Sequence, residues 1–126
     1  MYRAIALLAV VIALCRVGIT IGTFNDTVDE PYNVAAAIAM YGVGKHVAGT
    51  EQPPLTRLVA GLPLYLSGVR LPAKYHNTTV LSEPQTYLEG GDLLFHSSLS
   101  YEQILRRGRL AMLIFPALAL FYLYLL

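Results

Sequence analysis

The chain has 126 residues, of which 56% are hydrophobic and 13% are charged, and its formal net charge is +1. Soluble domains carry about 25% charged residues, so this composition excludes a soluble enzyme and a disordered chain. It indicates a mainly α membrane protein, with two transmembrane helices joined by a long outer loop. The balanced charge gives no case for a nucleic-acid partner, and the single cysteine excludes an internal disulfide.

The first predicted element is a transmembrane helix within residues 1–24. Its apolar run from Ala4 to Gly22 has 19 residues. At about 1.5 Å per residue this run would extend roughly 28 Å, close to the thickness of a bilayer core. A cleaved signal peptide is the alternative interpretation. We favour an uncleaved span, because no small-x-small cleavage site follows the run.

Three residues of this first helix are candidates for packing against a partner. Arg16 interrupts the apolar run, and a charge near the middle of a span costs roughly 2.5–3.5 kcal/mol on insertion scales. We expect Arg16 either to face another subunit or to extend to the membrane surface. Gly18 and Gly22 have the GxxxG spacing that permits close helix contact, although chance also produces this spacing near helix ends.

Residues 25–105 are predicted to form the outer loop, which contains two interfacial helices. The first, near residues 30–42, begins at Asp29-Glu30-Pro31, where an acid and a proline suit a first helical turn. The second, near residues 54–67, begins at Pro53-Pro54 and repeats leucine at helical spacing. Both helices are too short or interrupted to span a bilayer. We expect them to lie at the membrane interface or to pack on other spans.

A second transmembrane helix is predicted over residues 106–126. Leu110–Leu126 is a run of 17 residues without a charge, at the short end of the usual span length of about 17–25. Pro116 is expected to kink it. Because the chain ends inside this run, without the polar anchor that normally follows a span, we expect more protein to follow. The preceding residues 69–103 are rich in turn formers and are expected to be irregular.

The distribution of charge predicts the orientation. Arg3 and the amino group precede the first helix, which favours a cytoplasmic N-terminus and a periplasmic loop in a bacterial inner membrane. All eight acidic residues lie between Asp26 and Glu102. The arginine cluster that includes Arg106 and Arg109 would then lie on the outer side. Acidic lipid, a phosphate ligand or carboxylates of the loop could hold this cluster in place.

The segment from Asp26 to Glu30 places three carboxylates, including Asp29, directly after the first helix. Carboxylates at a membrane surface can act as a general base, as metal ligands or as acceptors for a sugar hydroxyl. The alternative is that they cap a helix and complement its dipole. The histidines have no metal-ligand spacing, so no cofactor is predicted, and the use of a divalent metal stays open.

Three segments together resemble a known family. Asp29-Glu30 follows the first span, Glu51-Gln52-Pro53-Pro54-Leu55-Thr56-Arg57-Leu58 follows the helix of small residues, and Arg106-Arg107-Gly108-Arg109-Leu110-Ala111-Met112 leads into the second span. This combination is similar to the N-terminus of the type C membrane glycosyltransferases. The resemblance is nearest to bacterial proteins related to dolichyl-phosphate-mannose–protein mannosyltransferase and to the aminoarabinose transferase of lipid A.

The resemblance implies transfer of a sugar from a polyprenyl-phosphate donor to an acceptor on the outer face of the membrane. It implies that Asp29 is the base that activates the acceptor, that Glu30 is its partner, and that Arg109 contacts the donor phosphate. It also implies a fold of many spans. We therefore do not expect the 126-residue chain to be catalytic on its own.

Two other functions stay open. The chain could be a small accessory subunit of a larger membrane assembly, such as a respiratory or photosynthetic complex, with Arg16, the GxxxG spacing and the interfacial helices as docking surfaces. It could also be a secreted or single-anchored domain, which requires cleavage after the first apolar run and anchoring by the second.

Overall fold

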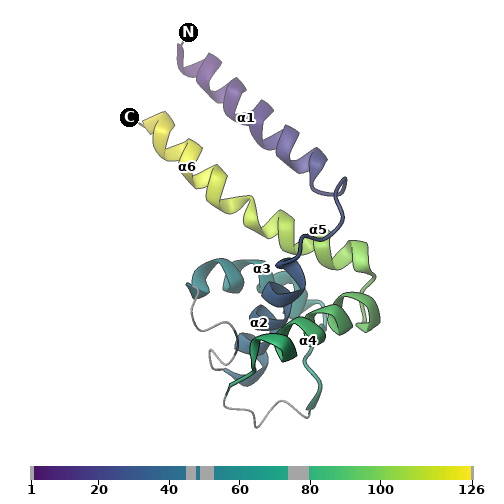
Figure 1. The fold of residues 1–126 in the computed structure, drawn as a ribbon. Coiled ribbons are helices and arrows are strands. Elements are labelled where there is room, and N and C mark those ends of the chain that lie inside the picture. The colour runs from purple at the N-terminus through teal and green to yellow at the C-terminus, as the bar shows by residue number, and fades with distance from the viewer. Residues whose placement is uncertain (1, 45–47, 49–52, 74–79, 126) are drawn as a thin grey trace.

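A computed structural model describes residues 2–44, 48, 53–73 and 80–125 of the chain. The described residues do not include Glu51 and Gln52, the first two residues of the segment that resembles the family, or the terminal Leu126. Helices account for most of the described chain, which contains no strand (Figure 1). They are α1 (Tyr2–Thr20), α2 (Glu30–Val43), α3 (Pro54–Leu66), α4 (Glu83–His96), α5 (Tyr101–Met112) and α6 (Ile114–Leu125).

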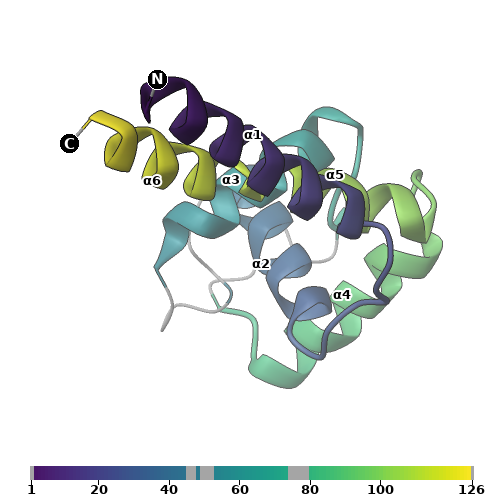
Figure 2. The same cartoon turned by 90° about the horizontal axis from the view of Figure 1, so that it is seen from above.

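Two apolar helices form a hairpin that projects from the other four. Helices α1 and α6 lie side by side, with both termini at the end farthest from α2, α3 and α4 (Figures 1 and 2). Large apolar side chains are exposed along both helices, among them Leu8 on α1 and Phe121 on α6. Tyr101–Leu125 is long and apolar enough to cross a membrane, whereas the apolar part of α1, Ala4–Thr20, is shorter.

The helix that carries the second apolar run begins before the predicted residue 106. Helix α5 starts at Tyr101, and its first turns pack on α3 through the buried Ile104 and Leu105. The expected disturbance at Pro116 is present. Proline has no N–H to donate to the carbonyl of Met112, and the helix is interrupted at Leu113, between α5 and α6.

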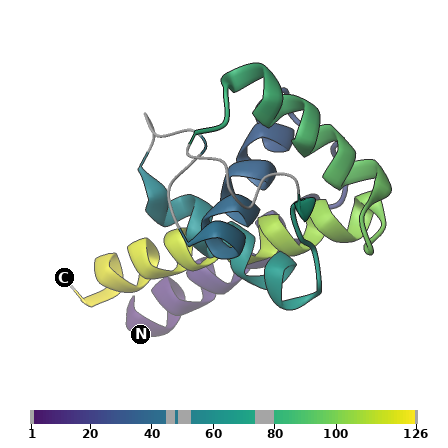
Figure 3. The same ribbon diagram turned by 90° about the horizontal axis from the view of Figure 1, so that it is seen from below.

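The helices expected near residues 30–42 and 54–67 are present as α2 and α3. Helix α2 ends before Gly44, whose φ of +70° lies in the left-handed region that favours glycine. Figures 2 and 3 show α2 enclosed between α3 and α4. Its alanines at positions 35–37 and 39 are buried, so α2 keeps no broad apolar face for lipid. Helix α3 keeps an exposed apolar face, because Leu55 and Leu66 are exposed.

The expectation of irregular structure over residues 69–103 is wrong, because helix α4 lies within this range. Its first turn is stabilised by Gln85, whose side-chain oxygen accepts hydrogen bonds from the backbone N–H and the hydroxyl of Ser82 at 3.0 and 2.9 Å. Gly90-Gly91 is one of the pairs of turn-forming residues within this range. In the structure Gly90 instead permits close helix contact, because a Cβ atom there would lie 1.9 Å from the carbonyl oxygen of Pro31.

This contact predicts a large difference between two neighbouring glycines. We expect Gly90→Ala to lower the free energy of unfolding by about 3 kcal/mol, because the methyl group forces α4 away from the first turn of α2. Gly91→Ala is the matched control: a Cβ there meets no atom within 4 Å, and alanine stabilises a helix interior by roughly 0.5–1 kcal/mol. Thermal unfolding in detergent, followed by circular dichroism, measures both. Equal effects would contradict the close packing of α4 on α2.

Candidate functional site

The three carboxylates predicted as a site lie in the segment that leads from α1 into α2, at the base of the apolar hairpin (Figure 1). We call residues 25–30 the acidic loop. Each carboxylate has a different protein partner. Asp26 contacts Tyr101, Asp29 contacts Tyr87, and Glu30 contacts Arg109. The three groups therefore have different chemical environments, although they lie within five residues of one another.

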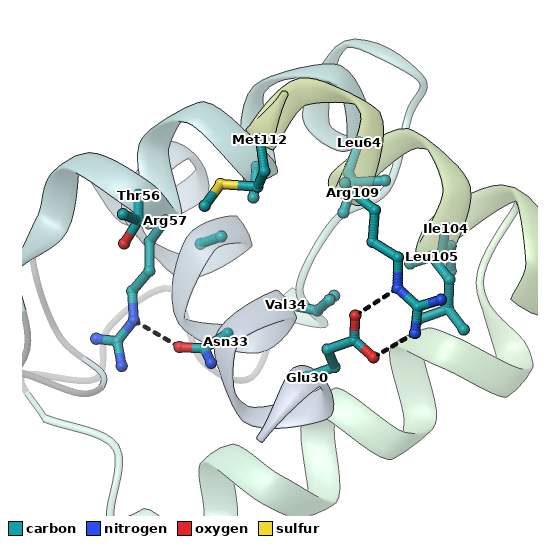
Figure 4. Close-up of a pocket in the computed structure, with 14 residues that line it drawn as sticks. Glu30, Asn33, Val34, Thr56, Arg57, Leu64, Ile104, Leu105, Arg109 and Met112 are labelled. Carbon is teal, nitrogen blue, oxygen red and sulfur yellow. Dashed lines mark hydrogen bonds and ion pairs between the residues drawn. The ribbon is translucent and has the colours of Figure 1, made fainter. Parts of the chain in front are cut away.

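Glu30 forms a bidentate ion pair with Arg109 of α5. The Oε1 atom accepts from Nε of Arg109 at 2.7 Å, and Oε2 accepts from a terminal nitrogen at 2.7 Å (Figure 4). The Oε2 atom also accepts from the backbone N–H of Thr27 at 2.8 Å. The two side chains are 24% and 19% exposed, so little solvent screens their attraction. Glu30 thereby joins the start of α2 to α5.

The remaining donors of Arg109 hold the segment that follows α1. One terminal nitrogen donates to the carbonyls of Ile21 and Phe24, and the other donates to the carbonyl of Asn25, each at 2.8 Å. A guanidinium has five N–H groups, and these contacts together with those to Glu30 use all five. A carboxylate of the loop therefore holds Arg109. This is one of the three ways in which the arginine cluster was expected to be held. No donor of Arg109 is left for a phosphate in this arrangement.

Asp29 is the most accessible carboxylate of the three. It occupies the N-cap position of α2, as expected, but its side chain makes no capping hydrogen bond. Its side chain is exposed, and one oxygen accepts from the hydroxyl of Tyr87 on α4 at 3.2 Å. Burial and this hydrogen bond raise the pKa of Tyr87. The phenol therefore stays protonated at neutral pH and acts as a donor to Asp29.

Asp26 is tied to the start of α5. The hydroxyl of Tyr101 donates to Asp26 Oδ1 at 2.6 Å and accepts from the backbone N–H of Asp26 at 2.8 Å. The ring of Tyr101 stacks on Phe95, with centroids 5.3 Å apart. These contacts fix the first part of the acidic loop and leave the Asp26 carboxylate less accessible than that of Asp29.

A cavity of about 290 Å³ lies between α2, α3 and α5, next to the acidic loop (Figure 4). Its walls are mostly apolar, and the Glu30–Arg109 pair lies at one side. At the other side Arg57, which is 3% exposed, donates to Asn33 Oδ1 at 3.0 Å. The guanidinium also lies 5.3 Å from the ring centroid of Tyr32. Arg57 belongs to the segment from Glu51 to Leu58. The spacing of residues in that segment did not predict that Arg57 is buried.

The candidate packing residues of α1 lie on the outside of the fold. Arg16 is exposed. A Cβ atom at Gly18 or Gly22 would meet no atom within 4 Å, so the GxxxG spacing does not support a close helix contact in the described part of the chain. Arg106 is exposed, and it lines a groove between α1 and α5 together with both glycines. Within the described residues, no group of three or more His, Cys, Asp or Glu side chains could hold a metal ion.

The sequence matches no protein-family model, and it has no significant match among curated proteins or solved structures.

Proposed function

We propose that the chain is the N-terminal module of a membrane glycosyltransferase, which transfers a sugar from a polyprenyl-phosphate donor to an acceptor on the outer face of a bacterial inner membrane. The observation that carries this proposal is the position of Asp29. Its exposed carboxylate lies at the base of an apolar hairpin, between a donor hydroxyl from Tyr87 and the Glu30–Arg109 pair. A general base for a membrane-bound donor needs this combination of accessibility and rigid support.

The contacts of Asp29 and Glu30 support different roles for these two acids. Glu30 makes three hydrogen bonds within the protein, and its proposed role is to position the first turn of α2. Asp29 accepts one hydrogen bond of 3.2 Å and keeps lone pairs free for an acceptor hydroxyl. In the proposed reaction Asp29 removes the proton of this hydroxyl as its oxygen attacks the sugar. The polyprenyl phosphate leaves with the bonding electrons.

The proposed membrane placement follows the apolar surfaces. Helices α1 and α6 span the bilayer, with the N-terminus in the cytoplasm and the acidic loop in the periplasm. Helix α3 lies at the outer interface, because the exposed Leu55, Leu62 and Leu66 recur at intervals of seven and four residues on one helix face. Further spans of a longer natural chain cover the exposed sides of α1 and α6 and complete the cavity for the donor lipid.

A second candidate is an accessory subunit of a larger membrane complex. It is favoured by the exposed apolar surface of the hairpin, by the exposed Arg16, and by Gly18 and Gly22, where a Cβ atom would meet no atom within 4 Å. In that function these groups dock on neighbouring subunits, and the acidic loop only stabilises the fold. The two candidates therefore differ in whether Asp29 is needed for sugar transfer.

Sugar transfer in isolated membranes tests the proposal. Membranes from cells with and without the gene receive a polyprenyl-phosphate donor with a radiolabelled sugar, and label in the lipid, glycan and protein fractions is counted. We expect label in one fraction to depend on the gene. If no fraction depends on it, while the gene's loss reduces the amount of a membrane complex, the accessory function replaces the proposed one.

A further inference from the structure

A groove of about 510 Å³ separates the last turn of α1 from α5. We call it the α1–α5 groove. It arises because α1 packs along α6, whereas its last turn and α5 stand apart and enclose an open volume. One wall carries Gly18 and Gly22, and the other carries Glu102 and Arg106. In the membrane placement proposed above, on which this inference depends, the groove lies at the level of the outer lipid head groups.

The glycine wall leaves the groove unobstructed. A Cβ atom at either Gly18 or Gly22 would meet no atom within 4 Å, so larger side chains could be accommodated there without strain. Gly18 lies in the last turn of α1, Gly22 lies two residues beyond its end at Thr20, and both line the groove. They thus provide a smooth surface of the kind against which an extended hydrocarbon chain packs, with Ile19 and Leu105 as apolar neighbours in the lining.

The charged wall carries a cation and an anion in a fixed order. Glu102 and Arg106 are one helical turn apart on α5, about 6 Å along the axis, and both are exposed. Neither forms an ion pair with another described residue. The neighbouring arginines differ from Arg106: Arg109 has all its donors engaged, and Arg107 donates to the hydroxyl of Ser67. Arg106 is therefore the member of the cluster that faces a ligand in the groove.

We propose that the α1–α5 groove binds a zwitterionic phospholipid of the phosphatidylethanolamine type. The phosphate lies at Arg106, the primary ammonium lies at Glu102, and an acyl chain follows the glycine wall. The order of charges supports this head group. Arg106 is one turn closer to the apolar α6 than Glu102 is, and in a phospholipid the phosphate is closer to the hydrocarbon than the terminal amine is.

The charges of the groove favour phosphatidylethanolamine over phosphatidylglycerol and phosphatidylcholine. An anionic phosphatidylglycerol would satisfy Arg106 but would place no cation at Glu102. The quaternary ammonium of phosphatidylcholine has no N–H to donate to the carboxylate, whereas ethanolamine has three. A transmembrane helix from another chain could fill an apolar groove, but it offers no matching pair of charges.

The experiment measures lipid retained by the full natural chain. The protein is reconstituted in nanodiscs of equal parts phosphatidylethanolamine, phosphatidylglycerol and phosphatidylcholine, and is then extracted into mild detergent. Native mass spectrometry measures the mass of the protein together with any lipid that it retains. We expect one retained phosphatidylethanolamine per chain, favoured roughly tenfold over the other two lipids. Arg106→Gln removes the phosphate contact, and Gly22→Leu fills the groove without changing charge. Both should lose the lipid, and Glu102→Gln should lose the preference for ethanolamine over choline.

Arg16→Gln is the matched control, because Arg16 is also an exposed arginine but does not line the groove; it should retain the lipid. Helical content by circular dichroism verifies that each variant is folded. The proposal would be overturned if both Arg106→Gln and Gly22→Leu retained as much phosphatidylethanolamine as the wild type. It would also be overturned if the groove bound a protein and no lipid. Carbonate extraction is run in parallel. A chain that stays in the membrane without retaining lipid refutes this inference alone, and a chain that is extracted refutes the membrane placement as well.

Discussion

Asp29→Asn is expected to reduce the rate of sugar transfer by roughly 10²–10⁴-fold, the range that a general base contributes. The amide cannot accept a proton at neutral pH, but it has the size of the carboxylate and still accepts the hydrogen bond from Tyr87. The fold should therefore be preserved, and the loss should be in kcat and not in the KM for the donor lipid. The measurement is the initial rate of label transfer in membranes that contain equal amounts of wild type or variant.

Asp26→Asn is the matched control in the same loop. Its side chain still accepts from Tyr101, and the proposed reaction does not use it, so its transfer rate should stay within a few-fold of wild type. Normal transfer by Asp29→Asn would refute the assignment of Asp29 as the base. A similar loss in both variants would indicate that the acidic loop has only a structural role.

The second large effect is expected at Arg109. Arg109→Met keeps an unbranched side chain that matches the aliphatic part of arginine, but it leaves the Glu30 carboxylate without its ion pair and three carbonyl groups without a donor. Because both charged groups are mostly shielded from water, we expect the free energy of unfolding to fall by about 3 kcal/mol. Arg109→Lys should recover part of this loss, since an ammonium has three donors and not five.

Arg106→Met is the control for this prediction, because Arg106 is on the same helix but exposed. Its stability, measured in a detergent that removes bound lipid, should change by less than about 0.5 kcal/mol. A double-mutant cycle with Glu30→Gln measures the coupling between the two charges. A coupling energy near zero would contradict the bidentate pair, even if Arg109→Met alone were destabilising.

Local signals in the sequence predicted α2 and α3 to within about a residue. Pro31 and Pro54 stand in first turns, and glycine or serine follows the last turns. Helix α4 was missed because Gly90 has two interpretations without tertiary structure: it ends helices in many sequences, but here it permits α4 to touch Pro31. The capping pair Ser82 and Gln85 was the signal that could have predicted this helix.

The contacts of the candidate site could not be predicted, because they join residues that are far apart in the sequence. Arg109 and Glu30 are separated by 79 residues, and Tyr87 and Asp29 by 58. The resemblance to the glycosyltransferases implied that Asp29, Glu30 and Arg109 belong to one site. Only the packing of α5 on α3 and of α4 on α2 distinguishes the paired Glu30 from the accessible Asp29.

The intact mass of the native protein, purified from its own membrane, tests the central claim most directly. A module of a glycosyltransferase with many spans requires a natural chain several times heavier than the 13.8 kDa of this sequence, and we predict such a mass. A native mass near 13.8 kDa would contradict the account. Two apolar helices cannot enclose a donor lipid, and the protein would then be a subunit of a membrane complex.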